Sequence, residues 1–483
     1  MDSRAQRNVV ARNAFYLLLG QIVSTALAIG LNAALGRSLG PADFGEYFVL
    51  TSMSTFAYVL VDWGQSAVLV REAASQLEFI GSLLGSVLAS RVTAAAAVMV
   101  FTTCFARLAG YEPRIQMLVI LAIGCAIPLA LSQPYGYVFR ALDRMDLDVL
   151  LAVCAKVLTV VATLAALSLE KRLESVFLAQ LVGGGGALAL ATILWRRLAL
   201  QTLRPSWAVV RDLWAQGTPL IFFIGAVAVQ PYIDAIVLSK LAPAAVVGYY
   251  GAARNIVGLL IAPAAILVTA AFPQMCRAAH HPAELHGLVR MALRPILLLG
   301  ALASVGCYLF ANFAVDLIYG ASHFGPSAEV VQFYGPVFFV LFFNMLLGIV
   351  VVATRRTREM AIAKFANILA STILALLLVP AFQTHWGNGG LGLVVAIGAG
   401  ELLMLIIFVA VLPRGMLDGM TLLDATRALS ASFATFALFW LLPPLSPWLG
   451  IPMCVIIYGL LSLTVGLVTR ADLIELSNML RRE

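Results

Sequence analysis

The sequence has little charge and no long polar stretch, and these two absences exclude most soluble architectures. Of its 483 residues only 11% are charged, whereas 62% are hydrophobic. That balance lies far from the composition of soluble globular chains. No gap between the apolar segments is long enough to hold a folded soluble domain. Whatever the protein does must therefore happen within a bundle of membrane helices.

Motifs for metals, cofactors and nucleic acids are also lacking. The six cysteines are scattered, without a disulfide framework or zinc-ligand spacing. The net charge of +7 comes from short basic clusters with no interleaved aromatics, so we expect no nucleic-acid partner. The run at 183-186 is four glycines without the Gly-Lys-Ser/Thr ending of a phosphate-cradling loop, and it indicates close helix packing. We expect no catalytic residues, no metal and no cofactor.

The chain does contain fourteen apolar segments, nearly all about 20 to 28 residues long. A hydrocarbon core about 30 Å thick is crossed once by a helix of this length, because each residue rises about 1.5 Å. A helix also satisfies its own backbone hydrogen bonds in lipid. The sequence predicts an all-α, polytopic membrane protein with about 14 transmembrane helices. The segments lie approximately at 14-36, 46-70, 82-107, 115-139, 148-169, 175-195, 214-239, 246-271, 288-313, 327-353, 360-382, 390-412, 428-446 and 451-469.

The positive charges are distributed unequally between the two sides of the predicted bundle. Arg91, Lys156 and Arg254 lie within spans and do not bear on orientation. With the N-terminus inside, 22 of the 31 basic residues fall at cytoplasmic ends and loops, and 6 fall on the opposite side. Cytoplasmic loops carry an excess of Lys and Arg, so both termini are expected in the cytoplasm.

An internal repeat organises the first twelve spans. Residues 37-47 read Arg-Ser-Leu-Gly-Pro-Ala-Asp-Phe-Gly-Glu-Tyr, and residues 239-250 read Ser-Lys-Leu-Ala-Pro-Ala-Ala-Val-Val-Gly-Tyr-Tyr. One inserted residue aligns their Pro, Gly and Tyr; the alternative is that these residues recur by chance in membrane turns. Six spans per half make the two halves run in the same direction. We predict an N-terminal six-helix lobe at 1-205, a C-terminal six-helix lobe at 206-413, and an appended helical hairpin with a cytoplasmic tail at 414-483.

Several degenerate motifs occur in a recognisable order along nearly the whole chain. They are Leu-Gly-Pro-Ala-Asp-Phe-Gly-Glu-Tyr at 39-47, Val-Asp-Trp-Gly at 61-64 with Arg71-Glu72, Asp234 before Val-Gly-Tyr-Tyr at 247-250, and Ala366-Asn367 running to Val379-Pro380. Their order resembles the polysaccharide-exporter branch, the O-antigen or lipid-linked oligosaccharide flippase type, of the multidrug/oligosaccharidyl-lipid/polysaccharide exporter superfamily. Gly-Gly-Leu-Gly at 389-392 departs from the Gly-Ala-Ala pattern usual in that family.

The resemblance implies two six-helix lobes around a central cavity, in the bacterial cytoplasmic (inner) membrane. It also implies alternating access to an undecaprenyl-diphosphate-linked oligosaccharide for O-antigen, lipopolysaccharide or exopolysaccharide biosynthesis. The implied partners are this lipid-linked oligosaccharide and the membrane lipids. A polysaccharide polymerase and other assembly proteins are candidate partners.

Six ionisable residues within spans are the candidate site residues. A charge at the centre of a helix in lipid costs about 2.5–3.5 kcal/mol on insertion scales, so each indicates a water-filled cavity or a partner. Asp62, Arg91 and Lys156 lie at a similar depth, about 12 Å from the cytoplasmic ends of their spans. Asp234 and Arg254 lie at matching depth from the outer face, and Glu401 lies near the middle of its span.

The cations and the carboxylates suit different roles. Arg254, Arg91 and Lys156 are candidate substrate-binding cations for the diphosphate. Asp234, Glu401 and Asp62 are candidates for ion coupling or gating, because the charge of a buried carboxylate depends on what its cavity faces. Two alternatives remain: structural pairing, Asp62 with Arg91 and Asp234 with Arg254, or snorkelling of the cations to the interface.

Three other functions compete with a flippase. A multidrug/ion antiporter of the same superfamily fits fourteen spans less well than a flippase does. A membrane glycan polymerase or ligase usually has a substantial outer loop, and the longest outer stretch, about 313-327, holds little beyond Asp316 and His323. A structural or assembly protein would not need intramembrane charges. The chain has no ATP-binding motif, so energy would come from an ion gradient, the membrane potential or removal of the product.

Overall fold

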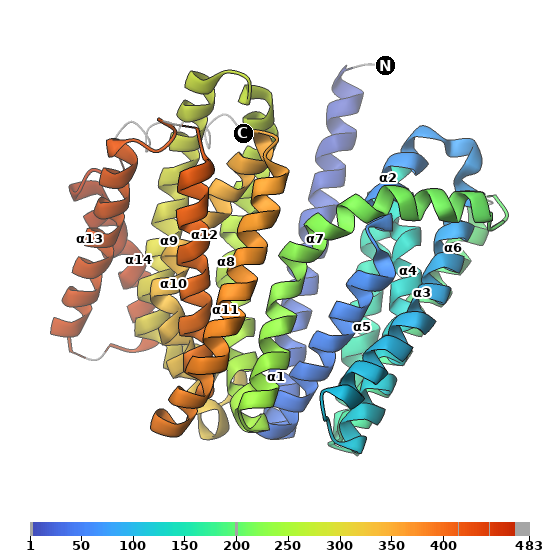
Figure 1. The fold of residues 1–483 in the computed structure, drawn as a ribbon, viewed down its shortest axis with the longest axis horizontal. Coiled ribbons are helices and arrows are strands. Elements are labelled where there is room, and N and C mark those ends of the chain that lie inside the picture. Colours follow the sequence, from blue (N-terminus) through green and yellow to red (C-terminus); the bar gives the residue numbers. More distant parts are fainter. Residues whose placement is uncertain (1–2, 199–200, 414, 444, 469–483) are drawn as a thin grey trace. The chain divides into compact units, whose positions relative to one another are not determined.

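The computed structural model describes residues 3–198, 201–413, 415–443 and 445–468. Side chains are described for these residues except at 3-15, 18, 219-220, 222-229, 231 and 321. Within these ranges the regular structure consists of α-helices and one short 3₁₀ helix, without strands (Figure 1). The prediction of an all-α polytopic membrane fold is confirmed.

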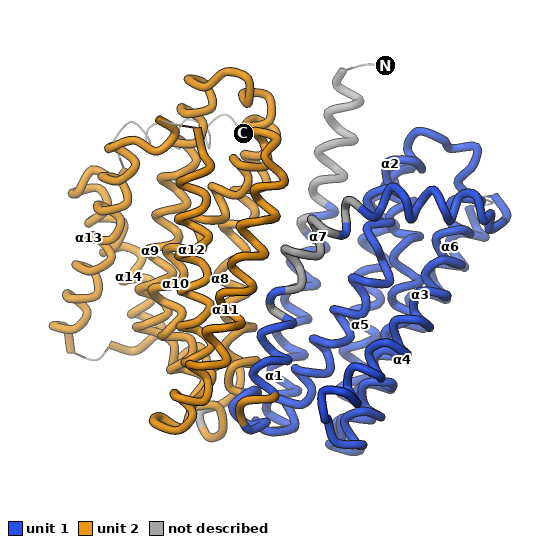
Figure 2. The backbone as a smooth tube through the Cα atoms, viewed as in Figure 1, with its two compact units in different colours: residues 1–239, 243–248 blue, residues 240–242, 249–483 orange. Residues whose placement is uncertain are grey.

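The chain forms two compact units, which are coloured separately in Figure 2. Unit 1 comprises residues 1–239 and 243–248, and unit 2 comprises residues 240–242 and 249–483. Unit 1 holds α1 (Ser3–Asp62), α2 (Gln65–Ser75), η1 (Leu77–Phe79), α3 (Ile80–Leu108), α4 (Pro113–Ala141), α5 (Met145–Leu169), α6 (Leu173–Arg197) and most of α7 (Trp207–Leu241). Unit 2 holds most of α8 (Ala244–Ala278) and all of α9 (Pro282–Tyr319), α10 (Ala321–Ala353), α11 (Thr357–Trp386), α12 (Gly389–Val411), α13 (Gly419–Leu441) and α14 (Pro447–Thr464). The lobe boundaries expected at 205 and 413 stay a prediction.

Twelve helices in the described part of the chain are long and apolar enough to cross a membrane. One of them, Leu19–Asp62, contains most of the first and most of the second predicted segments. Its two parts meet at Gly40, whose φ of 75° breaks the helix just before Pro41. The predicted span 214-239 lies on α7, where many side chains are outside the described set. Each of the fourteen predicted segments therefore lies on helix for most of its length.

The thirteenth helix begins earlier than the apolar pattern predicts, at 419 instead of 428. Asp418 caps it, because its carboxylate accepts a hydrogen bond from the Thr421 backbone N–H at 2.8 Å. This bond and one from the Thr421 hydroxyl lower the pKa of the Asp418 carboxyl. The helix ends at Leu441, because Leu442 precedes Pro443 and takes an extended conformation. Capping and proline, rather than hydropathy, set both ends of this helix.

The two repeated turns lie against each other at a pair of glycines, both in unit 1. A Cβ atom at Gly45 would lie 2.0 Å from the carbonyl oxygen of Ala244, and one at Gly248 would lie 1.9 Å from that of Pro41. Only glycine permits this approach of the two backbones. Gly45 and Gly248, which align in the two stretches, are therefore the residues through which the two turns contact each other.

The four-glycine run packs α6 closely against its neighbours, as the sequence predicts. A Cβ atom at Gly183 would lie 2.0 Å from Thr159 Oγ1 on α5, and one at Gly184 would lie 3.0 Å from the Leu129 backbone nitrogen on α4. Small residues allow such backbone approach in membrane bundles. The packing of α6 on α4 and α5 builds one wall of the site described below.

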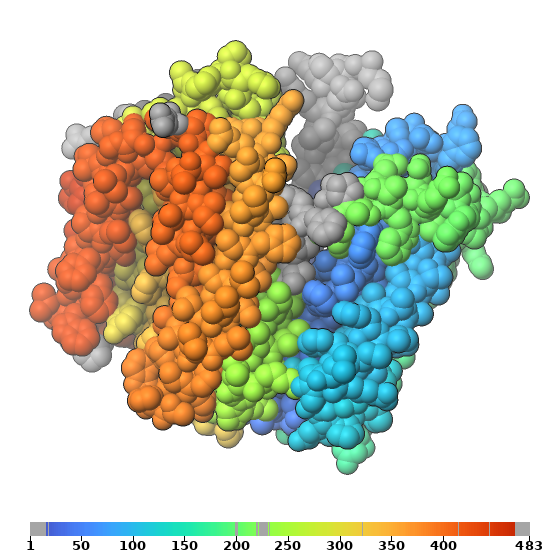
Figure 3. All heavy atoms as spheres, viewed as in Figure 1, coloured from blue at the N-terminus to red at the C-terminus, as the bar shows by residue number. Residues whose placement is uncertain are grey.

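The appended hairpin is joined to unit 2 by a buried cluster of charges. The fully buried carboxylate of Asp424, on α13, accepts a hydrogen bond from Arg294 Nε on α9 at 3.0 Å. Arg427 Nη1, one turn along α13, donates to the other carboxylate oxygen at 3.2 Å. Figure 3 shows α13, coloured orange-red, at the surface of unit 2, where the side chains of Leu422, Phe433, Trp440 and Leu441 are exposed. Apolar side chains of α13 are thus exposed on the surface, whereas the Asp424 carboxylate faces the interior of unit 2.

Candidate functional site

The structure brings together Asp62 and Arg91, two of the predicted site residues. Arg91 lies on α3 and is fully buried, and its Nη2 atom forms an ion pair with Asp62 Oδ1 at the end of α1. Asp62 Oδ2 accepts a hydrogen bond from the Ser66 hydroxyl at 2.5 Å. The Arg91 guanidinium also lies 5.8 Å from the centre of the Tyr58 ring. Pairing, the alternative to a substrate-binding Arg91, is therefore the arrangement that the geometry favours for these two residues.

A proline explains why Arg91 has a second partner. Pro134 on α4 has no N–H, so the carbonyl of Ala130 four residues earlier receives no helical hydrogen bond. Arg91 Nη1 donates to this carbonyl at 2.6 Å. Buried backbone oxygens without a donor are costly, so this contact stabilises both the proline-containing helix and the arginine.

The Asp62–Arg91 pair lies beside a break between α1 and α2. Trp63 has a φ of 44° and Gly64 a φ of 73°, both in the left-handed region. A tryptophan there is strained unless its surroundings hold it. The Trp63 indole donates to the Thr218 hydroxyl at 3.1 Å, and its ring lies 5.0 Å from that of Trp214 on α7. These contacts within unit 1 fix the geometry of the break and the position of Asp62.

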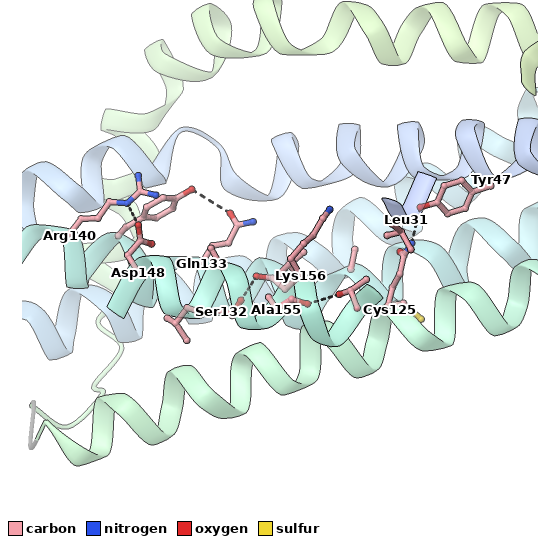
Figure 4. Close-up of a pocket in the computed structure, with 17 residues that line it drawn as sticks. Leu31, Tyr47, Cys125, Ser132, Gln133, Arg140, Asp148, Ala155 and Lys156 are labelled. Carbon is pink, nitrogen blue, oxygen red and sulfur yellow. Dashed lines mark hydrogen bonds and ion pairs between the residues drawn. The ribbon is translucent and has the colours of Figure 1, made fainter. Parts of the chain in front are cut away.

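Unit 1 contains a cavity of about 530 Å³ between α1, α4, α5 and α6 (Figure 4). Its polar lining consists of Lys156, Gln133, Gln180, Ser132, Thr159, Tyr47, Tyr137 and the pair Arg140 and Asp148. The remaining lining residues are Leu31, Cys125, Ala126, Leu129, Gly136, Leu151, Ala152 and Ala155. The cavity therefore lies among membrane-spanning helices and yet carries hydrogen-bonding groups.

Polar contacts mark the two ends of this cavity. At one end Arg140 on α4 forms an ion pair with Asp148 on α5. Gly136 lets the carboxylate approach α4, since a Cβ atom there would lie 2.3 Å from Asp148 Oδ1. At the other end Gln180 Nε2 donates to the Tyr47 hydroxyl at 3.1 Å. Figure 4 shows the Lys156 side chain between these ends.

Glu401 is held in the interior of unit 2 by two amides. Its side chain is only 4% exposed, and its Oε1 and Oε2 atoms accept hydrogen bonds of 2.8 Å from Asn367 on α11 and Asn344 on α10. Asn344 also donates to the Glu401 backbone carbonyl at 2.8 Å, while its own Oδ1 atom is buried without a hydrogen-bond partner. None of the described residues forms an ion pair with Glu401. A buried carboxylate in amide surroundings, next to an orphaned amide oxygen, is suited to hold a proton or a small cation.

The two remaining candidates lie in different units. Asp234 is on α7 in unit 1 and is 6% exposed, and Arg254 is on α8 in unit 2 and is partly buried. Their mutual pairing stays a prediction. When Pro41 is aligned with Pro243, Asn32 aligns with Asp234. Asn32 donates to the carbonyl of Ala28 at 2.9 Å on its own helix.

Sequence reasoning missed the uncharged members of both sites. Gln133 and Gln180 line the cavity near Lys156, and Asn344 and Asn367 hold Glu401. The available signal was an amide side chain inside an otherwise apolar run, since such groups in membrane helices require a partner. Ranking span residues by formal charge alone passes over this signal.

Comparisons with known proteins agree with this architecture. A sequence model of the polysaccharide biosynthesis protein family matches residues 10–279. The comparison with curated proteins finds no match. Among solved structures, lipid II flippase MurJ in an inward closed conformation has a TM-score of 0.74 at 12% identity, covering 96% of this chain and 100% of that chain.

Two further structures share the fold. An inward-facing multidrug resistance MATE family transporter of the MOP superfamily has a TM-score of 0.62 at 14% identity, covering 80% of this chain and 93% of that chain. A MOP superfamily transporter from Pyrococcus furiosus has a TM-score of 0.58 at 15% identity, covering 83% and 94%. At these identities the likeness establishes the fold, whereas the family follows from the sequence match, which spans more than half of the chain. The protein belongs to the polysaccharide biosynthesis protein family.

Proposed function

We propose that the protein is a flippase that moves an undecaprenyl-diphosphate-linked oligosaccharide from the cytoplasmic to the outer leaflet of the bacterial inner membrane by alternating access. The family match over residues 10–279 is the observation that carries this proposal. The cavity of unit 1 supports it, because hydrogen-bonding groups among membrane spans suit a polar cargo. The glycan would serve O-antigen or exopolysaccharide biosynthesis, with a polysaccharide polymerase and other assembly proteins as partners.

The charged residues take separate roles in this proposal. Arg254 and Lys156 attract the anionic cargo, while Arg91 stays bound to Asp62 beside the break between α1 and α2. Asp234 and Glu401 couple transport to an ion gradient. For Glu401 the support is a buried carboxylate whose hydrogen-bond partners among the described residues, Asn344 and Asn367, are uncharged. Uptake of a proton or sodium ion there would remove an uncompensated charge from the membrane interior.

Flipping of a labelled lipid-linked oligosaccharide in proteoliposomes tests the proposal. Wild-type protein should move the lipid faster than empty liposomes, and an imposed proton or sodium gradient should change the rate. Asp234→Asn and Glu401→Gln are nearly isosteric, so both should fold while flipping more slowly and depending less on the gradient. Lipid movement equal to that in empty liposomes would refute the flippase, and equal gradient dependence of all three proteins would refute the coupling roles.

A multidrug antiporter is the second candidate, because the MATE family transporter shares the fold at a TM-score of 0.62. The same proteoliposomes distinguish the two functions when loaded with a cationic dye in place of the lipid. Efflux of the dye without movement of the lipid would favour the antiporter. A glycan polymerase or ligase has less support, because the stretch at 313-327 is helical apart from Gly320, where an enzyme would need a long outer loop.

A further inference from the structure

The ammonium group of Lys156 enters the unit 1 cavity without a partner among the described side chains. It lies on α5, within the span Met145–Leu169. Across the described side chains, no carboxylate pairs with it, and no hydrogen bond from it is found. Lys156 is partly buried within a membrane span. A charge there is costly without a partner, so water or a ligand of opposite charge must offset it. The cavity provides room for either.

The other lining residues indicate which hydrogen-bonding groups the ligand must carry. The carboxamides of Gln133 and Gln180 and the hydroxyls of Ser132 and Thr159 surround the cavity. The two hydroxyls donate to carbonyls of their own helices, at 2.8 Å each, and keep their oxygens as acceptors. Amides and hydroxyls with neighbouring tyrosine rings match a ring with several hydroxyl groups better than they match a hydrocarbon chain.

Charge and size narrow the choice of ligand. Arg140 and Asp148 neutralise each other, which leaves Lys156 as the single uncompensated charge of the lining. One negative charge balances the cavity, whereas a diphosphate carries more and would remain partly uncompensated. A volume of about 530 Å³ lies within the range of small-molecule sites. We propose that this cavity binds a single sugar residue bearing one carboxylate, a uronic-acid type unit, with Lys156 on the carboxylate and the amides on the ring hydroxyls.

This inference rests on the proposed function only for the origin of the sugar, which would be a residue of the translocated glycan. The site itself is tested with free sugars. The probes are D-glucuronate, D-glucose as its neutral match, and inorganic pyrophosphate. Binding to the full chain in nanodiscs is measured by isothermal titration calorimetry. Glucuronate should bind at least about tenfold more tightly than glucose, because it gains a charge-assisted hydrogen bond.

Substitutions assign that preference to Lys156. Lys156→Met should reduce glucuronate binding about tenfold or more and leave glucose binding nearly unchanged, while Lys156→Arg should keep part of the preference. Lys364→Met on α11, which is also partly buried but lies outside the cavity, is the matched control and should behave as wild type. Lys156→Gln, which retains a polar head, replaces the Met variant if that protein does not fold.

Several results would overturn the inference. They are equal binding of glucuronate and glucose, no measurable glucuronate binding, or tighter, Lys156-dependent binding of pyrophosphate. The wild-type comparison alone decides the first two. Failure of the flippase proposal looks different, since a protein that binds glucuronate through Lys156 yet moves no lipid-linked oligosaccharide would keep the site and lose the transport role.

Discussion

At the scale of single residues, the chain places its membrane charges in two kinds of surroundings. Arg91 contacts a carboxylate, a backbone carbonyl and an aromatic ring, although its buried Nε atom has no hydrogen-bond partner. Lys156 and Glu401 have no ionic partner within the described part of the chain. A charge with an ionic partner on another helix stabilises the helix packing, whereas a charge without one is suited to bind an ion or a ligand reversibly. The contacts thus separate the paired Arg91 from Lys156 and Glu401, to which the proposed function gives cargo and ion binding.

The Asp62–Arg91 pair yields a stability prediction. Arg91→Met leaves the partly buried Asp62 without its cation and should lower the unfolding free energy by about 3–5 kcal/mol. Asp62→Leu combined with Arg91→Met removes both charges and should recover most of this loss, although the Ala130 carbonyl still lacks its donor. Thermal unfolding in detergent, followed by tryptophan fluorescence, measures the effect. Asp62→Leu alone completes the comparison. A loss of unfolding free energy in the double variant equal to the sum of the losses in the two single variants would contradict the pairing.

Arg254 yields a transport prediction. Arg254→Ala should abolish movement of the lipid-linked oligosaccharide at an unchanged protein level, because the proposed cargo loses one of the cations that attract it. Arg254→Lys should recover it in part, since lysine keeps the charge and loses the bidentate geometry of the guanidinium. The proteoliposome assay measures both. Wild-type transport by Arg254→Ala would remove this residue from the site.

At the scale of elements, glycine contacts decide how closely helices approach. Gly45 and Gly248 touch the backbone of the opposite repeated turn, where no neighbouring side chain can move aside. Gly186 instead faces the Leu158 side chain of α5, which has more freedom to adjust. Backbone contacts of the first kind should tolerate substitution least.

Gly248→Ala tests this difference. The added methyl would lie 1.9 Å from the Pro41 carbonyl oxygen, so the backbone must move, and we expect a loss of about 1–3 kcal/mol or of folded protein altogether. Gly258→Ala, on the same helix with nothing within 4 Å of its Cβ position, should be neutral or slightly stabilising. Yield and monodispersity in gel filtration compare the two. Equal behaviour would show that the repeated turns separate readily.

The sequence predicts positions along each helix better than rotation about it. Hydropathy locates the spans, and similar depth places Asp62 and Arg91 in one layer, where they meet. Depth also places Lys156 in that layer, yet no contact joins it to the pair, because depth says nothing of which face a residue occupies. Asn344 reaches Glu401 from another helix for the same reason. Such contacts between helices arise only from the packed bundle.

At the scale of the whole molecule, the orientation of the chain in the membrane is a prediction from the asymmetry of its basic residues. The basic residues predict that 140-146, 200-210, 277-287 and 414-424 face the cytoplasm and that 40-44, 170-173 and 320-326 face outward. The sidedness of every cavity depends on this orientation. For the proposed flippase, it therefore determines which leaflet delivers the cargo.

Cysteine labelling tests the orientation. In a background without the six native cysteines, Pro205→Cys and Pro282→Cys should not react with an impermeant thiol reagent in intact cells, whereas Ser322→Cys should react. All three positions are exposed in the structure, and permeabilised cells control for reactivity. Strong labelling at 205 or 282 in intact cells would reverse the assignment.

The buried Asp424 cluster has a consequence for anyone who wishes to shorten the chain. A truncation after residue 413 would leave twelve spans that look self-sufficient by hydropathy. It would also remove the carboxylate that now faces Arg294, and the guanidinium would meet hydrocarbon where α13 used to lie. A minimal version of the protein would need an apolar residue at 294 as well. The hairpin lies outside the predicted repeat of twelve spans. The Arg294–Asp424 contact nevertheless makes the preceding helices depend on it.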